Sequence, residues 1–260
     1  MISLGIFYDD WGNILETFFH PERNHGSGFE LLYQDDHLVI VNKPSGLLVH
    51  KTNIDFRADK NMVYLLKRQL GKWVYPVHRL DKATSGAIIF AFDKGTASQL
   101  CEFFASKRIQ KEYIALVRGY VKVNGHIDYP LKDLNRDGVM QDAQTYYERL
   151  KTFEHPLPVR PYDTARYSVI KLLPKTGRQH QIRRHLKHIF HPIVGDTCYG
   201  DGKHNLHCRN HFLCERLMLH ASKLSFLHPH THRPLEIEAQ APSSFQSVIT
   251  ALKPWCSATI

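Results

Sequence analysis

Short apolar runs separated by polar turns indicate a mixed α+β fold. Runs of four to eight β-branched and aromatic residues are typical of strands, whereas apolar residues three or four apart are typical of helices. We predict strands at residues 29–33, 38–42, 87–92, 111–117, 145–150, 166–173, 217–227 and 234–239. We predict helices at residues 58–70, 94–107, 178–188 and 243–252.

The remaining stretches are assigned from their polar and proline-bearing composition. Residues 132–161 are expected to form loops around one strand, and the His-rich segment 201–214 is expected to be a loop. Ser243 or Ser244 is expected to cap the last helix, because a serine hydroxyl can accept a hydrogen bond from a free N–H of the first turn. We expect a loosely packed N-terminal extension over residues 1–28 and one catalytic domain over residues 29–260.

The net charge of the chain favours a polyanionic partner. Its 34 Lys and Arg residues outnumber 25 Asp and Glu residues, for a formal charge of +9. Such an excess is common in nucleic-acid-binding proteins, although a basic protein without such a partner is the alternative. No apolar run reaches the length of a membrane span, and the N-terminus lacks the pattern of a secretory signal. Five cysteines without a CxxC pair indicate free thiols and a cytoplasmic location.

Asp81 is the first candidate catalytic residue. It follows His-Arg-Leu at residues 78–80 and precedes Thr-Ser-Gly at residues 84–86, where an apolar run begins. A carboxylate at the mouth of a buried strand and flanked by cations suits a nucleophile or base that acts on an anionic polymer. The alternative is a turn-forming aspartate that pairs with Arg79.

A cationic segment is the candidate surface for binding an anionic polymer. Residues 175–187 contain Lys175, Arg178, Arg183, Arg184 and Lys187. A helix that begins after the Gly177 turn would place several of these side chains on one face and its N-terminus toward an anion. One arginine could instead turn inward and keep a buried carboxylate ionised.

Tyr113 and the histidines each allow two interpretations. Tyr113 begins a strand, so its ring either packs in the core or stacks on a nucleobase. Eleven of the 18 histidines lie between His180 and His232, and three cysteines lie among them. Their spacing does not match that of structural zinc sites, so no metal is predicted. A zinc-dependent RNA enzyme stays open as an alternative. No glycine-rich phosphate loop occurs, so no nucleotide cofactor is predicted.

Four motifs occur in a specific order along the chain. They are Arg-Leu-Asp-x-x-Thr-Ser-Gly at 79–86, Lys-x-Tyr at 111–113, Thr-Gly-Arg-x-His-Gln-Ile-Arg-x-His-Leu at 176–186 and Arg-Leu-x-Leu-His-Ala at 216–221. Asn-Lys-Pro-Ser-Gly at 42–46 and His-Pro-Ile-Val-Gly-Asp at 191–196 accompany them. Each motif alone is weak, but the ordered set resembles the RluA family of RNA pseudouridine synthases over residues 30–239.

The resemblance implies a fold and a set of site residues. The family fold is a mixed, mostly antiparallel sheet with peripheral helices and a central RNA-binding cleft. Asp81 takes the place of the catalytic aspartate, and Arg183 that of the arginine that pairs with it. Arg79 takes the place of the arginine that fills the gap left by the flipped uridine. Tyr113 takes the place of the stacking tyrosine and proton-transfer candidate, and Leu219 that of an apolar residue in the uracil pocket.

The implied activity is isomerisation of uridine to pseudouridine in structured RNA, without metal or cofactor and by a monomer. Similarity is greatest to members that modify uridine 65 of tRNA, on the basis of Arg183-Arg184, the 199–205 loop and the absence of an S4-type domain. Ribosomal RNA is the alternative substrate, and a non-catalytic RNA-binding module is the alternative of another class. Attack of Asp81 on the ribose and abstraction of a sugar proton both stay open. Residues 1–28 and the His-rich segment inherit no role.

Overall fold

The computed structural model describes residues 7–8, 14–15, 28–50 and 61–256. Its helices are α1 (Met62–Leu70), α2 (Lys94–Ala105), α3 (Gln181–His188), α4 (Gly202–Phe212), α5 (Ser243–Leu252) and the short 3-10 turn η1 (Lys253–Trp255). Its longer strands are β3 (Glu30–Gln34), β4 (Leu38–Lys43), β6 (Ser85–Ala91), β7 (Gln110–Arg118), β8 (Asn124–Asp128), β11 (Gln144–His155), β12 (Ala165–Pro174), β13 (Leu219–Leu227) and β14 (Pro234–Glu238). Two-residue strands are β1 (Phe7–Tyr8), β2 (Ile14–Leu15), β5 (Tyr75–Pro76), β9 (Leu131–Lys132) and β10 (Met140–Gln141).

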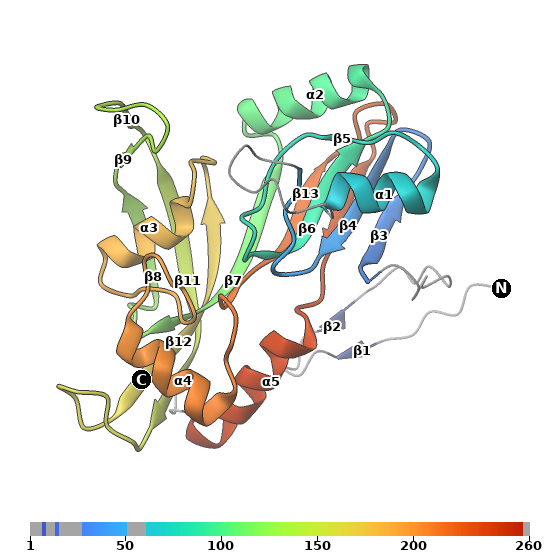
Figure 1. Cartoon of the computed structure of the whole chain (residues 1–260). Helices are drawn as coiled ribbons and strands as arrows, with labels where there is room; N and C mark the ends of the chain where they lie inside the picture. The colour runs from blue at the N-terminus through green and yellow to red at the C-terminus, as the bar shows by residue number, and fades with distance from the viewer. Residues whose placement is uncertain (1–6, 9–13, 16–27, 51–60, 257–260) are drawn as a thin grey trace.

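One large mixed sheet organises the domain (Figure 1). Eight strands follow one another in the order β3-β4-β6-β13-β7-β12-β11-β8, and β5 and β14 pair with β6 and β13 to complete a ten-stranded sheet. All pairs in this sheet are antiparallel except β6 with β13, which run parallel with Ser85 opposite His220. The predicted mixed, mostly antiparallel sheet with a few helices is therefore confirmed.

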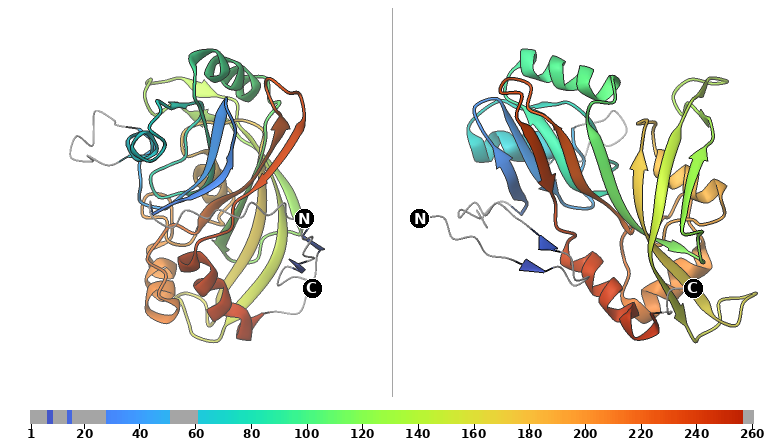
Figure 2. Two further views of the ribbon diagram at one scale, coloured as in Figure 1. Left: turned by 90° about the vertical axis from the view of Figure 1, so that its right-hand side faces the viewer. Right: turned by 180° about the vertical axis from the view of Figure 1, so that it is seen from behind.

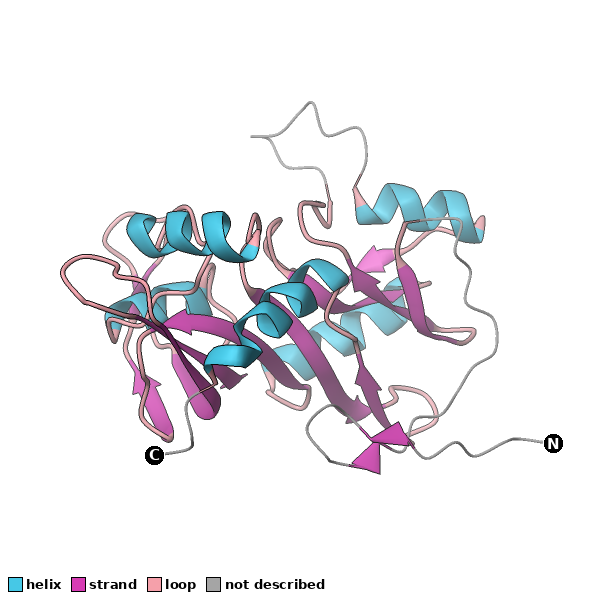
Figure 3. Cartoon of the chain, turned by 90° about the horizontal axis from the view of Figure 1, so that it is seen from below, coloured by secondary structure: helices cyan, strands magenta, loops and turns pink. Residues whose placement is uncertain are grey.

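Helices cover the two halves of this curved sheet separately (Figure 2). One apolar cluster joins β7, β12 and β13 to α3, α4 and α5. A second joins β4 and β6 to α1, and a third joins β4, β6 and β13 to α2. Coloured by type, the strands form a twisted band with the helices arranged around it (Figure 3). The β13–β7 pair therefore lies where the two halves of the sheet meet.

Gly86 permits the parallel contact between β6 and β13. Its φ is +121°, and a Cβ built on it would collide with the backbone carbonyl of Ala221.

We expect Gly86→Ala to lower the free energy of unfolding by about 2 kcal/mol or more, because both the backbone conformation and the strand spacing oppose a side chain. Chemical denaturation of the variant measures this. Gly202→Ala is the matched control, since a Cβ there meets nothing within 4 Å, and equal stabilities of the two variants would refute the packing argument.

Three sequence predictions were wrong in detail. The His-rich segment expected to be a loop forms α4, which Asp201 caps by accepting hydrogen bonds from the N–H groups of Lys203 and His204. The strand expected at residues 145–150 extends to His155, because β12 pairs with it as far as His155. Neither serine caps α5; Pro242 occupies the N-cap position, without a side-chain bond.

Helix α4 was missed because its histidines are unusual core residues. His204 Nδ1 lies 3.2 Å from the Tyr167 hydroxyl, and His207 Nε2 lies 3.1 Å from His155 Nδ1. Both imidazoles are buried. A histidine is normally polar in a periodicity pattern, so the apolar stripe that marks an amphipathic helix is weak here.

These buried imidazoles make the fold acid-sensitive. Burial lowers the pKa of His204 and of His220 from 6.5 to about 4. Between these pH values the unfolded chain binds protons that the folded chain does not, so stability rises with pH in this window and is lost as pH falls from about 6.5 to about 4. We expect the melting temperature to follow this course, and His204→Gln to flatten it. A melting temperature independent of pH over this range would contradict the prediction.

Most of the predicted N-terminal extension lies outside the described residues. The described part of residues 1–27 is the antiparallel pair β1–β2. The first residues of the predicted helix 58–70 also lie outside them. Helix α1 begins at Met62 and ends at Leu70, and Gly71 follows as its C-cap with φ +64°. Among the described residues, no helix is long and apolar enough to cross a membrane.

Candidate active site

A cleft of about 420 Å³ opens at the junction of the two halves of the sheet. Its walls come from the loop before β6, the end of α2, the start of β7, residue Leu219 of β13, and the turn between β12 and α3. Segments that are far apart in the sequence therefore meet there. Asp81 lies in this cleft, with 17% of its side chain exposed.

Asp81 is held by an arginine that a second carboxylate orients. Arg183 Nη1 donates to Asp81 Oδ2 over 3.1 Å. The same guanidinium donates to Asp196 through Nε over 2.7 Å and through Nη2 over 2.8 Å. Asp196 is almost fully buried and also accepts from the backbone N–H groups of Cys198 and Tyr199. Although burial acts in the opposite direction, these bonds hold the pKa of Asp196 below its ordinary value.

Arg183 therefore binds two carboxylates at once, those of Asp196 and Asp81. The bidentate pair with Asp196 fixes the plane of the guanidinium, and one remaining N–H points at Asp81. Sequence reasoning paired Arg183 with Asp81 alone and gave Asp196 no role. The signal was available, because Asp196 ends one of the quoted motifs, but its partner is visible only in three dimensions.

The turn before α3 is held by side chains of the same motif. Gln181 accepts from the Thr176 hydroxyl and the Arg178 N–H, and it donates to the Gln144 carbonyl and the Thr145 hydroxyl. His185 reaches the Thr145 hydroxyl over 2.9 Å. These buried polar contacts attach α3 to β11 and orient Arg183 toward the cleft. Arg183 therefore turns inward, which was the second of the two arrangements considered for the cationic segment.

Lys43 anchors the loop that carries Asp81. Its ammonium is fully buried and donates to the carbonyls of Pro44, Leu47 and Lys82. Ser45 donates to the carbonyl of Ala83 over 2.6 Å, so hydrogen bonds from the 43–47 turn hold residues 82 and 83, which follow Asp81. Burial lowers the pKa of Lys43 to about 7, against the attraction of the Asp81 carboxylate. This turn belongs to the Asn-Lys-Pro-Ser-Gly motif at residues 42–46, from which no function of Lys43 was predicted.

A chain of hydrogen bonds locks the start of β6 to β13. Arg216 donates to the Ser85 hydroxyl over 2.7 Å, and that hydroxyl lies 2.9 Å from His220 Nδ1. His220 Nε2 lies 2.8 Å from the carbonyl of Ala239, which can only accept. His220 Nε2 must therefore carry the proton, so Nδ1 accepts from Ser85. This gives the Thr-Ser-Gly and Leu-His-Ala motifs a structural explanation.

Tyr113 and Leu219 form the apolar side of the cleft. They lie on neighbouring strands, with Tyr113 opposite Ala221 and Leu219 opposite Ala115. Burial, reinforced by the charge of Asp81, raises the pKa of Tyr113, so its hydroxyl stays protonated at neutral pH. Tyr113 thus presents a ring and a neutral hydroxyl beside the carboxylate, which suits a stacked nucleobase.

The predicted cations divide between the cleft and its surroundings. Arg79, Lys175 and Arg178 are exposed and line the cleft. Lys187 is exposed on α3, and Arg184 is half-buried, and neither belongs to the cleft wall. No described ion pair joins Arg79 to Asp81, so the alternative of a simple Arg79–Asp81 pair has no support within the described part of the chain. Lys111, whose pKa burial lowers to about 8, adds a cation that sequence reasoning did not select.

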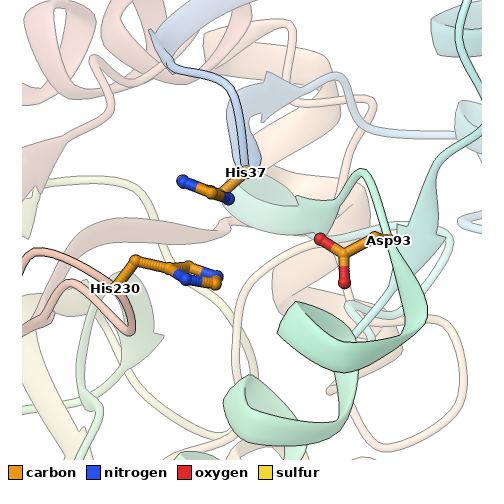
Figure 4. Close-up of side chains that lie close together, drawn as sticks. All are labelled: His37, Asp93 and His230. Carbon is orange, nitrogen blue, oxygen red and sulfur yellow. The ribbon is translucent and has the colours of Figure 1, made fainter.

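The described residues contain one His/Asp group compact enough to consider for a metal. His37, Asp93 and His230 bring one ligand atom each within 4.8 Å of one another (Figure 4). Both oxygens of Asp93, however, bond to Thr96 at the start of α2, and the Thr96 hydroxyl contacts His230 Nε2 over 2.8 Å. The imidazoles of His37 and His230 stack with centroids 3.7 Å apart and planes only 15° from parallel, so the in-plane lone pairs of their nitrogens do not converge on one ion as tetrahedral ligands must. These contacts explain the group as a helix cap. The histidines and cysteines of α4 do not form such a group in the described ranges.

Comparisons with known proteins agree with this architecture. Residues 37–188 match the family model described as RNA pseudouridylate synthase. The chain is 45% identical over 229 residues to a Haemophilus influenzae protein named tRNA pseudouridine synthase C, covering 85% of this chain and 96% of that one. It is 43% identical to the protein of the same name from Vibrio cholerae, covering 85% and 94% of the two chains.

Solved structures show the same fold. Human RNA Pseudouridylate Synthase Domain Containing 4 superposes with a TM-score of 0.67 at 27% identity, covering 86% of this chain and 92% of that one. Human RNA Pseudouridylate Synthase Domain Containing 1 superposes with a TM-score of 0.68 at 23% identity and covers 92% of both chains. The family model spans more than half of the chain, and the identities to curated relatives extend over most of it. The chain therefore belongs to the RNA pseudouridylate synthase family and is an enzyme that isomerises uridine to pseudouridine.

Proposed function

We propose that this enzyme converts one uridine of tRNA, of the position-65 type, into pseudouridine, with Asp81 as its catalytic carboxylate. The observation that carries the assignment of Asp81 is its place in the cleft, bound by Arg183 and beside Tyr113. The relatives named tRNA pseudouridine synthase C support tRNA as the substrate, because their similarity extends over 85% of this chain.

The chemistry requires an ionised carboxylate and a pocket for a detached base. The N1–C1′ bond of uridine breaks, uracil turns, C5 bonds to C1′, and a proton moves from C5 to N1. Asp81, ionised beside Arg183, either adds to the ribose or removes a proton from it. Tyr113 and Leu219 hold the uracil while it is free, since stacking on an aromatic ring contributes about 1–3 kcal/mol.

The cations at the cleft wall and on α3 bind the rest of the RNA. A stacked uridine cannot reach Asp81, so it must leave the helix. Arg79, exposed at the cleft and two residues from Asp81, is placed to fill the gap in the stack. Lys175 and Arg178 at the cleft wall, with Arg184 and Lys187 on α3, bind phosphates. Binding of RNA should therefore weaken with salt.

Release of tritium from RNA labelled at C5 of uridine tests this function. We expect up to one equivalent of tritium per transcript from tRNA with uridine at position 65, and none from the matched transcript with cytidine there. A fragment of ribosomal RNA serves as the competing substrate. Release from that fragment, but not from tRNA, would replace tRNA by ribosomal RNA as the substrate. Release from the cytidine variant would move the target to another uridine.

We also propose a domain organisation, an oligomeric state and a cellular location for the enzyme. Residues 29–260 act as the catalytic domain, because the large sheet and its covering helices span β3 to α5. We propose a monomer, and we place it in the cytoplasm because Cys101, Cys198, Cys208 and Cys214 form no disulfide, as is usual in a reducing compartment. Analytical ultracentrifugation tests the oligomeric state, and a sedimenting dimer would overturn this part.

A further inference from the structure

His180 has a strained backbone at the edge of the cleft. It precedes the first residue of α3 with φ 54° and ψ 26°, a left-handed conformation that non-glycine residues rarely adopt. Its side chain makes no capping bond to the helix. Such strain costs on the order of 1–3 kcal/mol and persists where the surroundings impose it, which is common at functional sites. The bonds of Gln181 described above hold this turn, and they direct the imidazole of His180 into the cleft.

The two nitrogens of His180 face two different partners. Nδ1 lies 3.1 Å from the hydroxyl of Tyr199. Nε2 lies 3.8 Å from Oδ1 of Asp81, the carboxylate oxygen that Arg183 does not contact. Arg183 and His180 therefore approach Asp81 at its two oxygens. The Tyr199 ring meets His180 edge-on and lies beneath the Arg183 guanidinium, so it supports both groups.

The partners determine which nitrogen carries the proton. Burial lowers the pKa of His180, against the attraction of Asp81, so the imidazole is neutral at neutral pH. A carboxylate can only accept, and a lone pair facing it would be repelled, so Nε2 carries the proton. Nδ1 then accepts from Tyr199, whose hydroxyl can donate. The resulting order of donors runs from Tyr199 to His180 to Asp81.

We propose that His180 is a positioning residue for Asp81: its Nε2–H, held by Tyr199, directs the oxygen of Asp81 that Arg183 leaves free. This inference rests on the proposed catalytic role of Asp81. The 3.8 Å separation is longer than a hydrogen bond, and catalytic contacts of this kind often shorten when substrate is bound. When Arg183 holds one oxygen of the Asp81 carboxylate and His180 holds the other, the carboxylate cannot rotate away from the reacting nucleoside.

A measurement without substrate tests the arrangement directly. Long-range 1H–15N correlation spectra assign the tautomer of His180, and titration gives its pKa. We expect the Nε2–H tautomer in the wild type and a lower His180 pKa in Asp81→Asn, because the attraction that favours the imidazolium is removed. The other charges facing His180 are Arg183, Arg79 and Asp196, and the variant leaves these in place. An Nδ1–H tautomer, or a His180 pKa that ignores Asp81, would overturn the proposal.

Kinetics separate positioning from structural support. Asparagine is one of the few non-glycine residues that adopt the left-handed conformation routinely, but its side chain is too short to place its N–H beside Asp81. We expect His180→Asn to keep or raise the melting temperature and to lower the single-turnover rate about tenfold to a hundredfold, the loss of a hydrogen bond to a charged group. His180→Gln, whose amide N–H reaches as far as Nε2, should recover most of the rate, and the Kd for tRNA should change little.

The control is His232→Ala. His232 has φ 54°, as His180 does, but is exposed and lies outside the cleft, so its variant should turn over like the wild type. Tyr199→Phe should lower the rate less than His180→Asn, since Nε2 can still face Asp81. A wild-type rate in His180→Asn would refute the proposal. Absence of wild-type activity on tRNA would instead refute the proposed substrate, and the spectra would still decide the role of His180.

Discussion

Asp81→Asn is expected to reduce the turnover of the enzyme by about a thousandfold or more. The substitution keeps the size and hydrogen-bonding shape of the side chain, but it removes the charge that would add to the ribose or accept its proton. Single-turnover conversion of a defined tRNA, followed by tritium release, measures the loss. The Kd for tRNA should change by less than about threefold, because Asp81 is an anion and contributes no attraction to phosphate.

The fold should tolerate this change. Asp81 is only partly buried, and Arg183 keeps its two bonds to Asp196 in the variant. The free energy of unfolding should therefore stay within about 1 kcal/mol of the wild-type value. Asp163→Asn, at an exposed position, is the matched control and should retain full activity. Wild-type turnover in Asp81→Asn would remove this residue from the catalytic role.

Arg183→Met should damage both catalysis and stability. The variant leaves the Asp196 carboxylate buried without its cation, and breaking a buried pair in this way costs about 3–5 kcal/mol. It also releases Asp81 from its only arginine partner among the described contacts. Turnover should fall at least about a hundredfold at temperatures where the variant is still folded. Denaturant titration and single-turnover assays measure the two effects separately.

Arg166→Met is the matched control for this substitution. Arg166 also pairs with a carboxylate, Glu154, but more than half of its side chain is exposed. Exposed pairs contribute about 0–1 kcal/mol, so this variant should be nearly as stable as the wild type and fully active. If the two arginine variants lost similar stability, burial of the Arg183–Asp196 pair would not be the cause. An Arg183→Met protein that binds tRNA and still turns over normally would exclude Arg183 from catalysis.

The sequence predicted elements best where local pattern and tertiary packing agree. β4 and β6 are largely continuous apolar runs, and β7 and β12 are rich in β-branched, aromatic and aliphatic residues. All four were predicted close to their observed ends. The pattern failed at α4, where buried histidines replace the usual apolar residues, and at the far end of β11, where pairing with β12 extends the strand. In both cases neighbouring elements, rather than local preference, decide the conformation.

The candidate site shows the same division. Asp81, Tyr113 and Arg183 became candidates from the sequence, because they take the places of functional residues in the motifs of the family that the chain resembles. Asp196, Lys43 and His180 also lie in the quoted motifs, but their residue types and local sequence did not indicate a function. Their importance comes from partners far along the chain: Arg183 for Asp196, the Lys82 carbonyl for Lys43, and Asp81 for His180.

The sequence by itself determined the class of this protein: a basic α+β domain with an ordered set of motifs and a carboxylate at the mouth of a strand. Only the tertiary structure decided how that carboxylate is held. Asp81 and Arg183 are 102 residues apart in the chain, and they meet beside the β6–β13 contact that Gly86 permits. Distances between such segments depend on the packing of the whole sheet, which no local pattern encodes.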